Sequence, residues 1–241
     1  MNQISKQGLF PWLTLFTGGV GLALRSLLLS SVDGQGLLPD NHFAGILTFI
    51  LLALFLGFCF WVVRKEPPVD AKNYRKLFPP SNLSAICSTV AAAGIGISAF
   101  MVPGTGVLRI LVAISGLLGA TALAYAAYFR KEGMRPSCFL HILVAVHLVI
   151  RVLTCCQQWG TEPQFQIYFF QLLGSLFLMI AVYYRAELDA LTGDYRKYLF
   201  FGQAALFCCC LCMAEEAWLF YLSAALWIAT DSCVLPRKGN E

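Results

Sequence analysis

The sequence predicts an all-α, polytopic integral membrane protein with eight transmembrane helices. Hydrophobic residues make up 59% of the 241 residues and charged residues only 12%, whereas about a quarter of the residues of a soluble protein are charged. Eight apolar segments cover most of the chain. Lysine and arginine are confined to alternate connections between these segments, as in a chain that crosses a bilayer repeatedly.

Five or six of the apolar segments reach the roughly 20 residues that a helix needs to cross about 30 Å of hydrocarbon. In chain order, the expected spans are Leu9–Leu29, Phe43–Val63, Leu83–Val102, Val107–Phe129, Ser137–Cys156, Phe165–Tyr184, Tyr198–Met213 and Ala217–Thr230. Because the connections are short, residues 1–241 are expected to form one membrane domain. The short connections leave no room for a soluble catalytic, nucleotide-binding or nucleic-acid-binding domain.

The first span continues past Arg25 without a small-residue cleavage site, so we expect a retained helix rather than a signal peptide. One face carries Thr14, Gly18, Gly21 and Arg25, a small and polar stripe that favours close helix packing. The fourth span follows the turn at 103–106. The helical face that starts at Arg109 also carries small residues along this span. These stripes predict faces that pack against protein rather than lipid.

The last two spans come from the stretch Tyr198–Thr230, which is long enough to be one helix. A single helix would carry Glu215 and Glu216 through the bilayer centre, at a cost of at least about 2.5 kcal/mol for each carboxylate. We therefore expect two short helices joined by a tight turn at Ala214–Ala217.

Most of the ten cysteines fall inside apolar segments, where a free cysteine is a small hydrophobic residue. The run Cys208–Cys212 does not suggest a metal site, because successive helical residues point in different directions and a tetrahedral site needs four converging ligands. We expect no metal and no other cofactor.

The basic residues fall in the connections after the second, fourth and sixth spans and at the two termini. They are Lys6, Arg64, Lys65, Lys72, Arg75, Lys76, Arg130, Lys131, Arg135, Arg185, Arg196, Lys197, Arg237 and Lys238. The four other connections contain only acidic charges. By the positive-inside rule, both termini and the basic loops lie in the cytoplasm, and the expected location is the plasma (cytoplasmic) membrane.

Two parts of the chain resemble each other. Arg64, Glu66 and the sequence Tyr74–Lys76 recur at one constant offset as Arg185, Glu187 and Tyr195–Lys197. This spacing predicts a tandem repeat with halves 1–131 and 132–241. With four spans in each half, the repeats would run parallel, related by an axis along the membrane normal. Several carriers have this arrangement, with ligand sites between the halves.

Polar residues within the apolar spans are the candidate ligand-binding residues, because ionisable groups in a membrane are costly and commonly functional. They are Arg25, Arg109, His147, Arg151 and Gln171. The three arginines start near the outer ends of their spans and predict an outward-facing polar vestibule for a small anionic or polar ligand. Two alternatives remain: an ion-pair network with Glu215 and Glu216, and arginines that reach lipid phosphates.

These features favour a permease-like or solute-binding membrane protein and not an enzyme. The first alternative is a non-catalytic scaffold or sensor subunit that binds a protein partner through cytoplasmic loop 64–82. An intramembrane enzyme using His147 is less favoured, since no second catalytic group accompanies it. The expected partners are the lipid bilayer, a small anionic ligand or a protein at that loop, and no nucleic acid.

Overall fold

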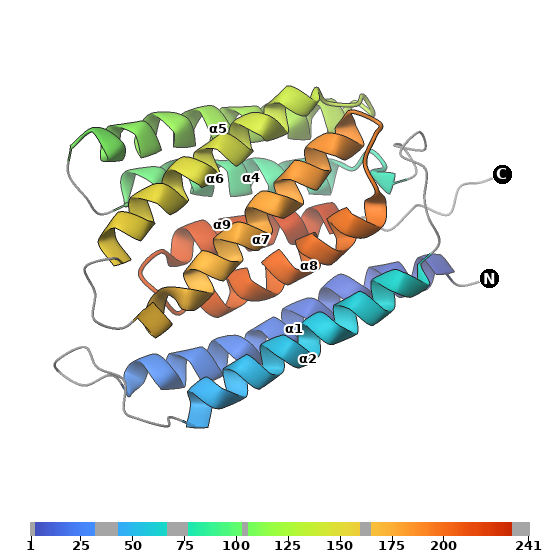
Figure 1. The fold of residues 1–241 in the computed structure, drawn as a ribbon. Helices are drawn as coiled ribbons and strands as arrows, with labels where there is room; N and C mark the ends of the chain where they lie inside the picture. The colour runs from blue at the N-terminus through green and yellow to red at the C-terminus, as the bar shows by residue number, and fades with distance from the viewer. Residues whose placement is uncertain (1–2, 32–42, 67–76, 103–105, 160–164, 233–241) are drawn as a thin grey trace.

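The computed structural model describes residues 3–31, 43–66, 77–102, 106–159 and 165–232, and their regular structure is entirely helical. The helices, shown in Figure 1, are α1 (Gln3–Ser30), α2 (Phe43–Lys65), α4 (Asn82–Phe100), α5 (Val107–Lys131), α6 (Cys138–Trp159), α7 (Phe165–Asp189), α8 (Tyr195–Cys212) and α9 (Trp218–Ser232). Each corresponds to one expected span, and the predicted break between the last two is present. The all-α fold class is confirmed.

Six of these helices, α1, α2 and α4 to α7, are long and apolar enough to cross a membrane. Large apolar side chains such as Phe16, Leu54, Ile86 and Phe139 are exposed on them, as expected where lipid replaces water. The described residues thus belong to a multi-pass helical membrane protein. Because α8 has 18 residues and α9 only 15, the eight-span count stays a prediction.

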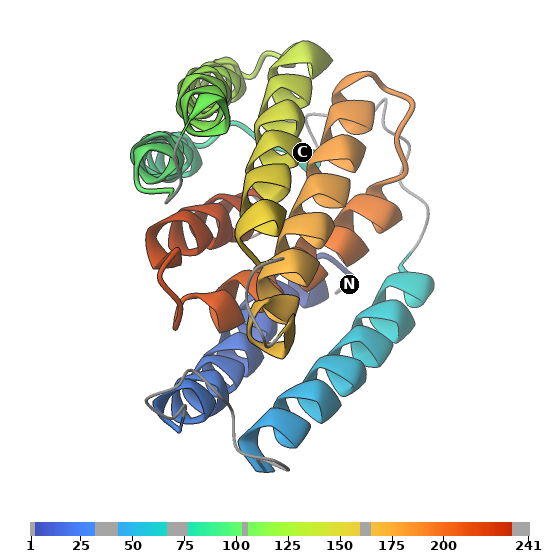
Figure 2. The same ribbon diagram turned by 60° about the vertical axis from the view of Figure 1, so that its left-hand side comes forward.

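Helices α4 to α9 form a closed ring. Each packs against the next helix along the chain, and α9 packs against α4. Helix α1 packs against α8 outside this ring, and α2 packs against α1 and α8. Figures 1 and 2 both show α1 and α2 together on one side of the other helices. The ring shields the side chains inside it from lipid.

Helix α8 is buried along nearly its whole length, between α1, α7 and α9. Small residues allow its neighbours to approach. A Cβ atom placed on Gly18 of α1 would lie 2.8 Å from the Cβ of Cys210, and one on Gly174 of α7 would lie 3.2 Å from the Cβ of Cys208. These cysteines are buried free thiols, so their predicted role as small packing residues is confirmed.

The predicted packing stripe of α1 lies against α8. Thr14 Oγ1 donates a hydrogen bond of 2.6 Å to Gln203 Oε1, and a Cβ on Gly21 would lie 2.5 Å from Leu211 Cδ2. A polar pair and close backbone contact therefore hold α1 to the ring, which is how helices associate where lipid removes the hydrophobic driving force.

The packing of the two predicted halves is not alike. In the half 132–241, the second helix, α7, packs against the third helix of the same half, α8. In the half 1–131, the second helix, α2, packs against α1 and against α8, which belongs to the other half. Part of the matched sequence, Tyr74–Lys76, lies outside the described residues. The tandem repeat therefore stays a prediction.

Candidate functional site

Buried polar side chains gather at the two opposite ends of the helix ring. We call the first set the Arg151 group, and it consists of Arg25, His147, Arg151, Gln171 and Glu215. We call the second set the Asp231 cluster, and it consists of Arg130, His141, Arg185, Asp189 and Asp231. All ten side chains are buried. Inside a membrane protein, buried ionisable groups are the first place to look for function.

Within the Arg151 group, Arg25 and Glu215 form an ion pair between α1 and the turn joining α8 to α9. Arg25 is 1% exposed, and its Nε and Nη2 atoms lie 3.1 and 2.9 Å from Glu215 Oε1. Its guanidinium carbon also lies 5.1 Å from the centre of the Phe170 ring. Burial raises the pKa of the Glu215 carboxyl, and the charge of Arg25 opposes that rise. The charge of Arg25 is therefore balanced within the protein.

Polar contacts between α7 and α9 surround this pair. The Gln171 side chain is close enough to stabilise the charged form of Glu215. The hydroxyl of Tyr221 donates to the backbone carbonyl oxygen of Gln171 at 3.3 Å and lies 3.4 Å from Ser175 Oγ. Gln171 thus lies beside Glu215 within a hydrogen-bonded wall of the ring.

Arg151 of α6 differs from the other buried arginines of the chain. It is 4% exposed, and its guanidinium carbon lies 3.9 Å from the centre of the Phe220 ring. Its Nη1 atom is buried without a hydrogen-bond partner, and no carboxylate of the described residues lies within ion-pair distance. A buried charge without a counter-charge costs several kcal/mol. Arg151 is therefore the group most in need of an anion.

His147 lies one helical turn before Arg151 and is fully buried. Its Nδ1 atom lies 3.1 Å from Ser115 Oγ of α5, and its Nε2 atom is buried without a hydrogen-bond partner among the described residues. Glycine makes room for the ring, because a Cβ on Gly116 would lie 3.1 Å from His147 Cε1.

The structure does not bring Arg109 or Glu216 to this group, since both side chains are exposed. Gly116 of α5 faces Ala99 near the end of α4. Arg109 lies two turns beyond that level, where α4 no longer covers α5. Arg25 and Arg151 are buried, and the expected vestibule with three converging arginines stays a prediction.

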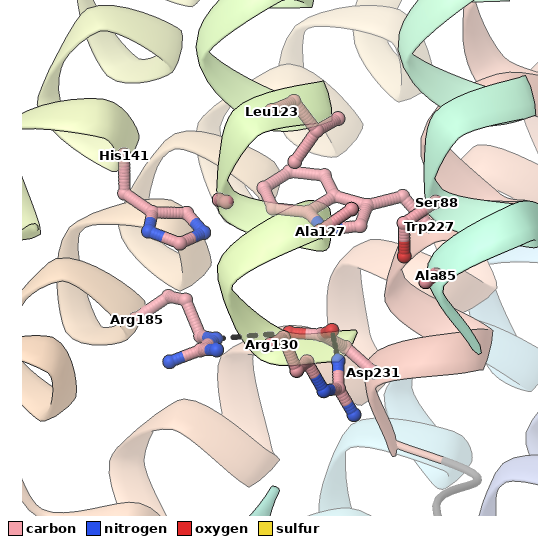
Figure 3. A pocket seen from close by; sticks show the side chains of 10 residues that line it. Ala85, Ser88, Leu123, Ala127, Arg130, His141, Arg185, Trp227 and Asp231 are labelled. Atoms are coloured by element: carbon pink, nitrogen blue, oxygen red, sulfur yellow. Dashed lines mark hydrogen bonds and ion pairs between the residues drawn. The ribbon is translucent and has the colours of Figure 1, made fainter. Parts of the chain in front are cut away.

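The Asp231 cluster, together with Tyr198 of α8, joins the ends of five helices, as Figure 3 shows in part. Asp231 of α9 accepts hydrogen bonds from Arg130 Nη1 of α5, from Arg185 Nε of α7 at 2.9 Å and from the Tyr198 hydroxyl of α8 at 3.1 Å. Asp189 accepts from Arg185 Nη1 at 2.5 Å, and its other oxygen lies 2.6 Å from His141 Nδ1 of α6. Two arginines and two carboxylates thus balance inside the ring.

A small cavity of about 10 Å³ lies in the Asp231 cluster, bounded by the side chains drawn in Figure 3. This volume is close to what one water molecule needs. His141 and Trp227 face it with nearly parallel rings, 12° apart with centroids separated by 6.0 Å. The Nε and Nη2 atoms of Arg130 are buried without hydrogen-bond partners, so polar donors are present at the cavity.

Sequence reasoning missed the Asp231 cluster. Arg130 and Arg185, interpreted as loop residues, belong to α5 and α7 and are buried in ion pairs; that assignment was wrong. The sequence did hold a signal, since Arg185 and Asp189 are four residues apart on one helix, where opposite charges pair. The second signal was Asp231, an acidic residue at the end of the last span that lies next to the basic residues Arg237 and Lys238.

Comparison of the chain with protein-family models, with curated proteins and with solved structures found no match in any of the three.

Proposed function

We propose that this multi-pass membrane protein binds a small anionic ligand at Arg151, as a permease-like or solute-binding protein. One observation carries the proposal: Arg151 is buried, and no carboxylate of the described residues pairs with it. By contrast, Arg25, Arg130 and Arg185 each contact a carboxylate. A carboxylate or phosphate group of a ligand would supply the missing charge through charge-assisted hydrogen bonds.

The surroundings of Arg151 suit a polar anion. His147, one turn away, has a buried Nε2 atom that makes no hydrogen bond with the described residues. Phe220 covers one face of the guanidinium, which leaves its edge for hydrogen bonds. If the predicted orientation holds, this end of the ring faces away from the cytoplasm.

The proposal can be tested without knowing the ligand. In Arg151→Met, the cation–π contact with Phe220 is lost, at a cost of up to about 2 kcal/mol. The larger cost of several kcal/mol for an unpaired buried charge is relieved at the same time. The ligand-free variant should therefore melt at a higher temperature in detergent than the unchanged protein. Arg109→Met is the matched control, because that arginine is exposed, and it should change little.

A loss of thermostability in Arg151→Met would mean that the arginine is structural, and the proposal would be dropped. A second measurement addresses binding directly. Inorganic phosphate, succinate and glutamate, each at millimolar concentration, should be tested for stabilisation of the unchanged protein. A stabilising anion should have no effect on Arg151→Met and an undiminished effect on Arg109→Met. Uptake of the same anion into proteoliposomes would then separate a permease from a binding protein.

A further inference from the structure

We propose that His141 and Asp189 form a reversible proton-binding site in the Asp231 cluster, at the end of the helix ring opposite Arg151. This inference goes beyond the proposed function and does not depend on an anionic ligand.

The geometry of Asp189 prepares the imidazole to accept a proton. One oxygen of Asp189 is held by Arg185 Nη1 at 2.5 Å, and the other lies 2.6 Å from His141 Nδ1. The two atoms lie within ion-pair distance but not in hydrogen-bond geometry, so the carboxylate acts on the imidazole through its charge. A carboxylate beside one ring nitrogen stabilises the imidazolium that forms when both ring nitrogens are protonated.

Titratable or charged groups face His141 from α5, α7, α8 and α9. Helix α5 contributes Arg130, α7 contributes Arg185 and Asp189, and α9 contributes Asp231. Helix α8 contributes the hydroxyls of Tyr195 and Tyr198. Helix α4 lines the cavity with Ala85 and Ser88, which do not titrate. With a neutral imidazole, the two arginines balance the two aspartates. Protonation of His141 would add one positive charge, which the two aspartates favour and the two arginines oppose.

The cavity beside His141 has a lining residue in common with a larger groove. The cavity of about 10 Å³ is bounded by His141, Ser88 and Ala85 and has room for about one water molecule. Ala85 also lines a larger groove of about 510 Å³ between α4 and α5, where Asn82 and Lys131 contribute polar groups. The cavity and the groove thus share one small side chain, Ala85.

Proton binding has a consequence for the ring. A third positive charge beside Arg130 and Arg185 would weaken the contacts that hold the ends of α5 and α7 to Asp231. His141 and Arg151 lie on the same helix, α6, so a movement of α6 would reach both ends of the ring. A coupling of the proton to an anion at Arg151 rests on the proposed function, whereas the proton site itself does not.

Trp227 provides a direct readout, because its ring is stacked on that of His141. A protonated imidazole next to an indole quenches its fluorescence by accepting an electron from the excited ring, which a neutral imidazole does poorly. The protein for the experiment keeps Trp227 as its only tryptophan, through the changes Trp12→Phe, Trp61→Phe, Trp159→Phe and Trp218→Phe. Emission is measured in detergent between about pH 5 and about pH 9, the range around the ordinary pKa of histidine.

Emission should fall on acidification along a one-proton titration curve. His141→Gln should abolish the titration, and His147→Gln should leave it intact, because that histidine lies elsewhere in the ring. Asp189→Asn should change the titration, since the carboxylate beside the imidazole is gone.

Two results would overturn the proposal: emission of the single-tryptophan protein that does not change with pH, and a titration that persists in His141→Gln. If His141→Gln does not fold, Trp227→Phe in the protein with all other tryptophans provides the second test. It should remove the pH-dependent part of the emission, and a pH dependence that remains unchanged would contradict the site.

Discussion

Glu215→Gln tests the ion pair that fastens α1 to the helix ring. The substitution keeps the shape of the side chain and removes its negative charge, while Arg25 stays buried with its positive charge. At 2.9 Å between Arg25 Nη2 and Glu215 Oε1, unit charges attract by about 6 kcal/mol at an effective dielectric constant of about 20. The amide oxygen of glutamine still accepts a hydrogen bond, so part of this attraction is replaced.

The expected loss of unfolding free energy is about 3 kcal/mol, the lower end of what the removal of one partner costs a buried pair. Unfolding in mixed micelles with increasing denaturing detergent measures it. Glu216→Gln is the matched control, because it makes the same change on the next residue, whose side chain is exposed. It should stay within about 0.5 kcal/mol of the unchanged protein.

The double variant Arg25→Gln with Glu215→Gln should be clearly more stable than the sum of the single losses predicts, because no buried charge is left unpaired. The pH dependence of Arg25→Gln has a definite sign as well. Burial raises the pKa of Glu215 and Arg25 opposes the rise, so removing Arg25 leaves a carboxyl that is protonated more readily in the folded state. The contribution of Glu215 to the stability of this variant should be greatest at low pH and fall as pH rises through that folded-state pKa. Additive single losses, or a control as damaging as Glu215→Gln, would refute the reasoning.

Three further predictions concern other parts of the chain. Asp231→Asn removes a carboxylate that pairs with Arg130 and Arg185, so the unfolding free energy should fall by about 3–5 kcal/mol. A variant that fully keeps its monodisperse peak in size-exclusion chromatography after heating would contradict this. Gly116→Ala places a Cβ 2.2 Å from that of Ala99 and should cost about 1–3 kcal/mol in the same unfolding assay. Gly19→Ala is the control, because a Cβ at this position has nothing within 4 Å; it should be neutral or stabilising by up to about 1 kcal/mol. Equal losses of stability for Gly116→Ala and Gly19→Ala would contradict the close packing of α5 on α4. A single cysteine at position 72, which lies outside the described residues, should react with a membrane-impermeant thiol reagent only from the cytoplasmic side, and labelling of intact cells would reverse the predicted topology.

The helices were predictable because hydrophobicity in a membrane protein is a local property. Each apolar segment became one helix, and the split between α8 and α9 followed from the cost of carrying Glu215 through a span. The stripe of Thr14, Gly18 and Gly21 indicated the packed face of α1, because small residues are placed where backbones approach.

The candidate site was harder to predict, because it depends on which helices meet. Arg25 and Arg151 look alike in the sequence, yet Arg25 pairs with Glu215, whereas Arg151 contacts Phe220 and pairs with no carboxylate of the described residues. Asp231 was overlooked since an acidic residue near a helix end is usually solvated, and only ring closure by α9 against α4 brings it to Arg130 and Arg185. Charge periodicity along one helix cannot reveal a contact between five helices.

The attachment of α1 to α8 has a consequence for biogenesis. Arg25 precedes its partner by 190 residues, so at a synthesis rate of 5–20 residues per second roughly 10 to 40 s pass before Glu215 is made. During that time α1 must enter the bilayer on hydrophobicity alone, with Arg25 extended toward the lipid headgroups from a position near the helix end. Docking of the first helix to be synthesised is therefore among the last steps of assembly, and a nascent chain that stops before α8 has no groove to receive it.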